Sequence, residues 1–161
     1  MRMLALLLGM MMWWGTVQAM EPGERLAPWT LLDQYDRPYS LDGRLRLLLV
    51  ARSMAGGKLV EAALADRPKG YLASRNAVFV ADISRMPALI SKLFAVPAMR
   101  DYPYRVLLDR EPRVADRYMA PGEGVLCLWL RDGTLQRQRL LNSAEDIRRV
   151  LAEADAGAPG S

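Results

Sequence analysis

Short runs of apolar residues alternate along the chain with polar segments that contain glycine and proline. Positions 45–51 and 77–83 are apolar almost throughout, and a shorter run of the same kind occupies 104–109. Runs of this length, bounded by turn residues, are typical of strands that are buried on both faces. The pattern therefore predicts two buried strands, at 45–51 and 77–83, and a third strand at 104–109.

The segments that follow these strands have apolar residues at helical spacing. One helix is predicted to begin at Gly56-Gly57, a second to occupy 86–99, a short third one 111–119, and a last one to begin after Ser143. An amphipathic helix normally turns its apolar stripe toward the core, and Pro97 should end or kink the second helix. The predicted stripes are Leu59, Val60, Ala63 and Leu64; Leu89, Ile90, Leu93 and Phe94; and Ile147, Val150, Leu151 and Ala154.

Turn residues predict a hairpin at 124–141 and, at 29–43, a hairpin or two short strands. At 29–43, two short apolar segments flank the polar turn "DQYDRP", with Pro38 at an edge. At 124–141, two β-type runs flank Asp132-Gly133, a strong two-residue hairpin turn. The alternation in its second strand puts Leu135, Arg137 and Arg139 on one face. Strands that alternate with helices predict parallel pairing, and the second hairpin predicts an antiparallel edge, so the expected fold is α/β with a mixed sheet.

Residues 1–19 have the organisation of a secretory signal peptide. Arg2 is followed by an apolar run at 3–14 and by the small-residue pattern Val17-Gln18-Ala19. The apolar run is shorter than the roughly 20 residues that span a bilayer. Cleavage after Ala19 is therefore expected, with an uncleaved membrane anchor as the alternative. The predicted parts are the signal peptide at 1–19, one domain at 20–155 and a flexible tail at 156–161, and the mature protein is expected to be periplasmic or secreted, without membrane attachment.

The composition of the 161-residue chain excludes several classes of function. Its formal charge is +4, and it becomes +3 if the signal peptide is removed, because that peptide contains one charged residue, Arg2. The arginines are dispersed and form no basic stripe, so no nucleic-acid partner is expected. The sequence contains no histidine, which is the most common metal ligand and the usual general base near neutral pH. No metal and no cofactor are therefore predicted.

Residues 27–154 resemble the thioredoxin-like superfamily in its redoxin or peroxiredoxin-like branch. The segment "APWTLLDQYDRPYSL" is similar to the opening hairpin of that branch, with Arg37 where a glycine is usual, and "RLLLVA" and "GVLCLWLRDGTLQ" are similar to its central strand and final hairpin. The resemblance implies a mixed central sheet flanked by helices, with a C-terminal Asp-Gly hairpin and helix. Cysteine-free periplasmic proteins of the YtfJ type are the most similar group, through the segment from Asp82 to Pro87 and through "YPYRVLLD".

Redox members of this superfamily place cysteines directly after the central strand, where a helix N-terminus lowers the pKa of a thiol. The corresponding positions here are 53–57, "SMAGG", and they contain no cysteine. Dithiol oxidoreductase activity is excluded because the chain has one cysteine in total. The resemblance also implies a cis-proline that faces this site, but the matching position is Gly124, and Pro121 lies three residues earlier. Both parts of the redox site are therefore expected to be missing.

Two segments are candidates for binding a ligand or a partner. The backbone N–H groups of 53–57, assisted by Arg52 or Lys58, are a candidate anion site, and the alternative is a linker that preserves the fold. The segment 99–105 contains tyrosines beside arginines, a composition favoured at interaction surfaces, and the alternative is that its rings cover the edge of the sheet. The candidate contact residues are Arg52, Ser53, Gly56, Gly57, Tyr102 and Tyr104.

Cys127, the single thiol, lies between two leucines in a predicted strand. Free cysteine packs as a small apolar residue, so burial is expected, and the alternative is a nucleophile or a redox sensor. No residue is predicted to be catalytic. The sequence favours an exported, non-redox binding or accessory module that acts on a protein or a small ligand in the periplasm. The alternative is a single-thiol enzyme that uses Cys127.

Overall fold

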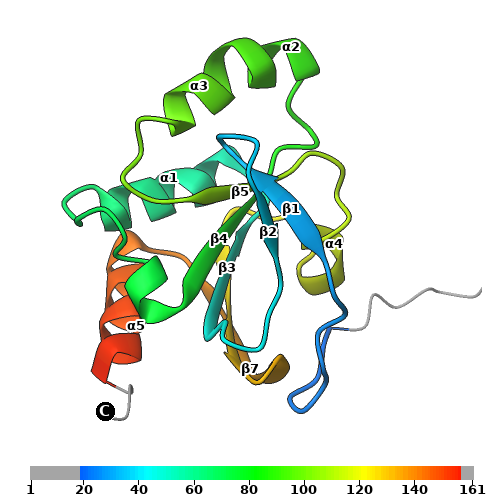
Figure 1. Ribbon diagram of the computed structural model, residues 1–161, viewed down its shortest axis with the longest axis vertical. Helices are drawn as coiled ribbons and strands as arrows, with labels where there is room; N and C mark the ends of the chain where they lie inside the picture. The colour runs from blue at the N-terminus through cyan, green and yellow to red at the C-terminus, as the bar shows by residue number, and fades with distance from the viewer. Residues whose placement is uncertain (1–18, 157–161) are drawn as a thin grey trace, which may run out of the picture.

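A seven-stranded mixed sheet forms the centre of the computed structural model, which describes residues 19–156 (Figure 1). The strands are β1 (Thr30–Asp33), β2 (Pro38–Ser40), β3 (Leu47–Ala51), β4 (Ala77–Asp82), β5 (Val106–Asp109), β6 (Val125–Arg131) and β7 (Thr134–Leu141). Their order is β2-β1-β5-β4-β3-β6-β7, in which β3, β4 and β5 are parallel and the other pairings are antiparallel. The expected mixed α/β fold is confirmed. The segment 1–18 of the predicted signal peptide and the predicted tail beyond residue 156 lie outside the described residues.

Helices cover both faces of the sheet (Figure 1). Helices α1 (Met54–Leu64) and α5 (Ala144–Ala156) pack together on one face, and the single turn α4 (Ala115–Tyr118) covers the other. The 3-10 turn η1 (Ala73–Arg75) precedes β4. A helical segment at 88–99 consists of α2 (Ala88–Ile90), the π-helical η2 (Ser91–Ala95) and α3 (Val96–Met99). Between residues 19 and 156, no helix has the length and apolar character needed to span a bilayer.

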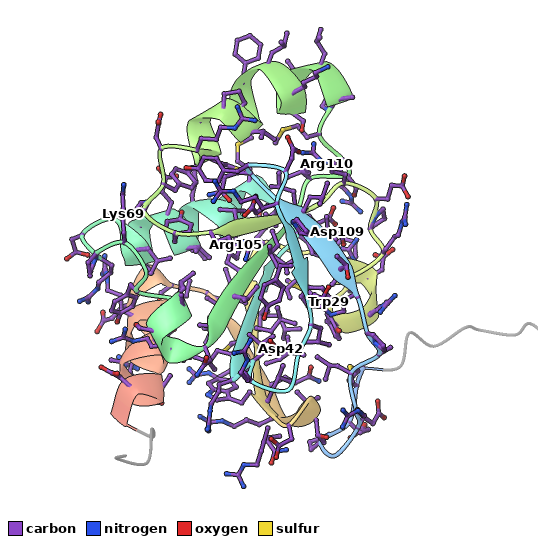
Figure 2. The ribbon with its side chains drawn as sticks, in the orientation of Figure 1. Trp29, Asp42, Lys69, Arg105, Asp109 and Arg110 are labelled. Carbon is purple, nitrogen blue, oxygen red and sulfur yellow. The ribbon has the colours of Figure 1, made fainter. Side chains whose placement is uncertain are left out.

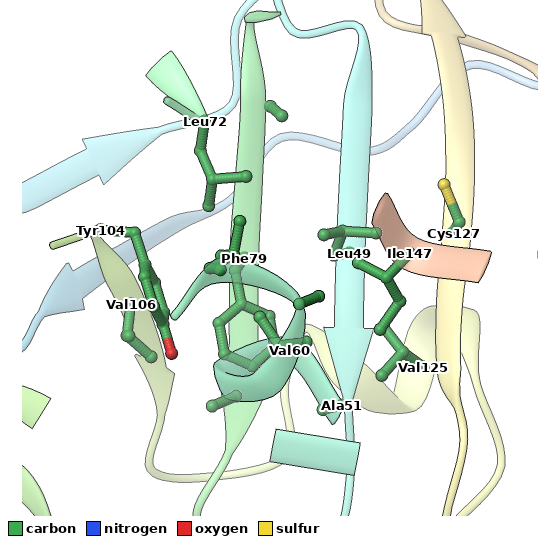
Figure 3. Close-up of a cluster of buried hydrophobic side chains, with 14 of the residues drawn as sticks. Leu49, Ala51, Val60, Leu72, Phe79, Tyr104, Val106, Val125, Cys127 and Ile147 are labelled. Carbon is green, nitrogen blue, oxygen red and sulfur yellow. The ribbon is translucent and has the colours of Figure 1, made fainter. Parts of the chain in front are cut away.

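Strand β3 lies between β4 and β6, and all five of its residues are buried. Successive residues of a strand face opposite sides of the sheet, so β3 contributes to two separate cores. Leu49 packs in the core beneath α1 and α5, where Figure 3 shows it with Val60 and Ile147. Leu48 packs in the core on the side of α4. The strands predicted at 45–51, 77–83 and 104–109 are confirmed as β3, β4 and β5.

Both hairpins are present. The second one turns at Asp132 (φ 51°) and Gly133 (φ 77°), which are the left-handed conformations that a two-residue type I′ turn requires. A register shift after Trp129 marks a β-bulge, so Leu135 is buried in the α4 core and Leu141 in the α1–α5 core. The expected placement of Leu135, Arg137 and Arg139 on one face is therefore wrong, because a bulge reverses the faces of the residues beyond it.

The helical segment at 88–99 differs from the sequence prediction. Its expected core residues are exposed, Leu89 by 67% and Phe94 by 64%, whereas the buried residues of the segment are Ser91 and Val96. The prediction of burial is wrong because helical spacing shows that a helix has an apolar side but not what that side contacts. Pro97 does not end the segment, since it lies in the first turn of α3, where the missing N–H of proline is tolerated.

The helix predicted at 111–119 is shortened to the single turn α4. The buried carboxylate of Asp109, at the end of β5, accepts hydrogen bonds from the backbone N–H groups of Val114 and Ala115, at 2.9 and 2.8 Å. The first N–H groups of a helix have no partner within the helix. Asp109 therefore caps α4 from the sheet and fixes where the turn begins.

Candidate functional site

The junction between β3 and α1 is the position at which redox proteins of similar sequence order hold their cysteines. Ser53 has extended backbone angles and is the N-cap of α1, and the Gly56 N–H donates a hydrogen bond of 3.0 Å to its Oγ. The helix begins at Met54, two residues before the predicted start. The Ser53 hydroxyl therefore caps the N-terminus of α1, which is the common role of a serine at this position.

The start of α1 packs directly against the loop that precedes β6. A Cβ atom on Gly56 would lie 2.8 Å from the carbonyl oxygen of Gly124 and 3.2 Å from that of Glu123. The resemblance predicts Gly124 at the position of the substrate-facing proline, and no peptide bond among residues 19–156 is cis. Gly57, in contrast, has no atom within 4 Å of a Cβ built on it. The two glycines therefore differ: Gly56 is needed for packing, and Gly57 faces open space.

Arg52 directly follows β3, at the start of the junction, and is 7% exposed. Its Nε is 2.9 Å from Asp82 Oδ2, its Nη2 is 2.5 Å from Asp116 Oδ1, and its Nη1 donates to the carbonyl oxygen of Met119. Two carboxylates and a carbonyl thus surround the guanidinium. The structure places Arg52 in a buried ion-pair network and not on the loop at 53–57, where it was expected to assist an anion.

The side chain of Asp82 is the most buried in this network. Burial by itself would raise the pKa of its carboxyl group, but the hydroxyl and N–H of Ser84 and the guanidinium of Arg52 hold that pKa below its ordinary value. The network ties the ends of β3 and β4 to α4. Its arrangement is that of a structural cross-link at the junction between β3 and α1.

The two candidate tyrosines stack on each other, with ring centroids 5.1 Å apart and an interplanar angle of 24°. Tyr104 is 7% exposed and packs in the α1–α5 core beside Phe79, as Figure 3 shows. Burial, followed by the neighbouring Tyr102 and Glu61, raises the pKa of the Tyr104 phenol. Tyr102 is half-buried at the surface. The ring of Tyr104 therefore covers the core. The ring of Tyr102 is accessible to a ligand.

Cys127 has no exposed surface and lies opposite Leu49 in the sheet. Burial raises the pKa of its thiol to about 12, despite an opposing effect of Arg137. The thiolate is the reactive form of cysteine. At neutral pH the thiol is therefore both inaccessible and protonated, and its expected burial is confirmed.

An apolar surface at the junction end of the sheet was missed by sequence reasoning. The loop after β4 leads to the 88–99 segment, so this segment lies at the same edge as the start of α1, which follows parallel strand β3. Met54, in the first turn of α1, is 70% exposed. We call the exposed set Leu89, Ile90, Leu93 and Phe94 the apolar helix face. Its spacing is visible in the sequence, but the same spacing is typical of a helix that packs on a core.

Comparisons with known proteins identify the fold. No protein-family model and no curated protein matches the sequence. Peroxidoxin BcpB from Mycobacterium tuberculosis is 19% identical, with a TM-score of 0.56, over 87% of this chain and 99% of that chain. Thio-disulfide isomerase from Thermus thermophilus is 22% identical, with a TM-score of 0.55, over 88% and 100%. The thioredoxin domain of a thiol-disulfide oxidoreductase from Bacteroides vulgatus is 13% identical, with a TM-score of 0.53, over 84% and 98%.

At these identities the similarity shows the fold, and the protein has a thioredoxin-like fold. The fold that the sequence resemblance implied is confirmed. The narrower resemblance to proteins of the YtfJ type stays a prediction. Function has to be argued from the residues of this chain, because one fold supports many activities.

Proposed function

We propose that the protein is an exported, non-redox binding module of the periplasm that recognises a protein partner through the apolar helix face. The observation that carries this proposal is the exposure of Leu89, Ile90, Leu93 and Phe94 on one helical segment. Contiguous exposed apolar patches commonly mark protein interaction sites, and aromatic residues are enriched in interfaces. The partner is therefore expected to present an apolar surface of its own.

The junction supports a binding role rather than a catalytic one. The hydroxyl of Ser53 caps α1, the guanidinium of Arg52 is engaged by Asp82 and Asp116, and Gly56 is packed against Gly124. These groups already have partners within the protein. The function of this end of the fold is then to hold α1 and the nearby helical segment in place for a partner.

The alternative of a single-thiol enzyme has no observation in its favour. A nucleophilic cysteine needs an accessible thiolate and an activating group such as a histidine. Cys127 is fully buried, its thiol pKa is raised to about 12, and the sequence contains no histidine. The proposal is therefore restricted to binding.

The experiment that tests the partner is affinity capture from periplasmic extract with three matched baits. Wild-type protein and Lys92→Ser, a change of an exposed polar residue in the same helical segment, should retain the same partner. Phe94→Ser should lose it, with little effect on stability, because exposed substitutions usually change the free energy of unfolding by less than about 0.5 kcal/mol. Equal capture by all three baits, or no captured protein, would contradict the proposal.

Self-association is a separate outcome of the same design. Sedimentation of wild type and Phe94→Ser shows whether the apolar helix face binds a second copy instead of another protein. A monomer in both cases agrees with the proposal, and a dimer that Phe94→Ser dissociates contradicts it. The export part is tested by N-terminal sequencing of the periplasmic protein, which should begin at Met20.

A further inference from the structure

A hollow of about 860 Å³ opens at the amino ends of β4 and β5. The junction lies at the carboxyl ends of the parallel strands, so this hollow is at the opposite edge of the sheet. Four segments form its walls: the turn at 33–37, the loop at 42–45, the loop at 69–76 and the segment at 100–105. Figure 2 labels Asp42, Lys69 and Arg105, which come from three of these segments. Small-molecule sites commonly have volumes of about 300–1,000 Å³.

The walls have an excess of positive charge. Two of the carboxylates are neutralised by arginines: Arg105 Nε lies 2.8 Å from Asp33 Oδ2, and Arg44 Nη2 lies 3.2 Å from Asp42 Oδ2. The remaining charged groups of the lining are Arg37, Lys69, Arg100 and Asp101, and none of them forms an ion pair within residues 19–156. Three uncompensated cations against one carboxylate favour a ligand with negative charge.

Buried polar side chains hold the walls in place. Gln34 is 1% exposed, and its Nε2 donates to the carbonyl oxygen of Tyr104 at 2.9 Å, while the N–H of Val106 donates to its Oε1 at 2.9 Å. Arg100 Nε donates to the carbonyl oxygen of Gln34 at 2.8 Å. These hydrogen bonds fix the turn at 33–37 to the segment that precedes β5. The walls are therefore preorganised in the absence of a ligand, and preorganisation favours binding.

Aromatic and aliphatic side chains complete the lining. Tyr39, Tyr102 and Tyr104 are part of the walls, together with Leu45 and Val78. A site for a small organic molecule combines apolar side chains with polar groups that fix the orientation of the ligand, and this lining contains both kinds. A neutral apolar compound would use the tyrosines but not the cations, whereas inorganic phosphate would use the cations but not the tyrosines.

We infer that this hollow binds a small organic anion, a carboxylate with an aromatic or aliphatic body. The carboxylate pairs with cations among Arg37, Lys69 and Arg100, and the body packs against tyrosines of the lining. This inference does not rest on the proposed function, because the apolar helix face contributes no residue to the hollow. It gives the protein a ligand site that is separate from its partner surface.

The test uses naphthoate as the anionic probe and naphthylmethanol as a neutral compound of similar size. Amide resonances of the isotope-labelled protein are followed during titration with each compound. Naphthoate should shift resonances at 33–39, 69–78 and 100–105, and it should bind about tenfold more tightly than naphthylmethanol, the size of one charge-assisted contact. The inference is overturned by equal affinities, by shifts confined to residues 89–94, or by no shifts at millimolar naphthoate.

Matched variants test the role of charge. The double variant Arg37→Gln and Lys69→Gln should weaken naphthoate binding about tenfold and leave naphthylmethanol unchanged. The control double variant Lys92→Gln and Arg131→Gln removes two exposed cations that lie outside the hollow, and it should bind both probes as wild type does. Equal effects of the two double variants would contradict the inference. Phe94→Ser should not alter naphthoate binding, so failure of the partner proposal and failure of this one are distinguishable.

Discussion

Gly56 and Gly124 meet at the start of α1, where a Cβ on Gly56 would lie 2.8 Å from the Gly124 carbonyl oxygen and 3.1 Å from the Cβ of Ala51. Contacts this short require the backbone to move, because a carbonyl oxygen cannot rotate away as a flexible side chain can. A side chain at position 56, including a cysteine, is therefore incompatible with the observed packing. The junction is a closed structural contact in this protein.

Gly56→Ala should destabilise the protein by about 1–3 kcal/mol, the usual range for overpacking. This loss outweighs the gain of about 1 kcal/mol that alanine normally gives over glycine in a helix. Urea denaturation of the two proteins measures the difference in the free energy of unfolding.

Gly57→Ala is the matched control, because it makes the same chemical change one residue later in the same helix. Nothing lies within 4 Å of a Cβ at this position, so the substitution changes only the helix propensity. The free energy of unfolding should therefore rise by about 0.5–1 kcal/mol. If Gly56→Ala proves as stable as Gly57→Ala, the contact with Gly124 does not restrict position 56 to glycine.

Arg52→Met should lower the free energy of unfolding by about 3–5 kcal/mol, because it leaves the buried carboxylate of Asp82 without its cation. The surface pair offers a control: Arg44 is highly exposed beside Asp42, so Arg44→Met should change stability by less than about 1 kcal/mol. Thermal or urea unfolding distinguishes the two variants. Similar small losses in both would show that the Arg52 network contributes little.

The ion pair between Arg52 and Asp82 predicts that the free energy of unfolding depends on pH in the acidic range. The folded-state pKa of Asp82 is below its ordinary value of 3.8, so its contribution to stability is present above that value and is lost as the pH falls through the folded pKa. Arg52→Met removes one of the groups that lower this pKa. The stability of the variant should therefore fall less steeply than that of wild type as the pH decreases below about 4. Parallel acid-unfolding curves would contradict this assignment.

The strands and hairpins were predictable because their signals are local. A buried run such as 47–51 is bounded by turn residues, and Asp132-Gly133 specifies its own turn conformation. The bulge after Trp129 was not predictable, since one extra residue in a strand changes no local pattern. The exposure of Phe94 was not predictable either, because it depends on the position of the whole helical segment relative to the sheet.

The contacts of the candidate sites depend on residues that are far apart in the chain. The sequence identifies Arg52 next to a helix start, but its partner Asp82 follows a different strand. Gln34 reads as one polar residue in a turn, whereas the fold buries it against Tyr104 and Val106. Such pairings arise from strand order, which local spacing does not specify.

Gln34→Ala should destabilise the protein by about 1–3 kcal/mol, because it leaves the buried N–H of Val106 and the carbonyl of Tyr104 without the hydrogen bonds that Gln34 supplies. Gln136→Ala, an exposed change of the same type, should be neutral within about 0.5 kcal/mol. Urea denaturation measures both. A neutral Gln34→Ala would indicate that water replaces the amide at no cost.

The thiol of Cys127 should resist labelling in the folded protein and react only upon unfolding, because it has no exposed surface. Its alkaline behaviour gives an independent test. The thiol pKa is about 12 in the folded protein against an ordinary value of 9.0, so the folded state retains a proton that the unfolded state loses. Stability from this group is complete below about pH 9 and declines as the pH rises toward the folded pKa, by up to about 1.4 kcal/mol per pH unit.

Cys127→Ala lacks this titration but keeps the tyrosines that also titrate in alkali. At neutral pH the variant should be about 1 kcal/mol less stable than wild type, because a buried sulfur is removed. Above pH 9 only wild type loses stability through the thiol, so the difference between the two proteins should narrow as the pH rises. Urea denaturation at a series of alkaline pH values measures this difference. A constant gap, or rapid labelling of the folded wild type, would mean that the thiol is accessible and ionises normally.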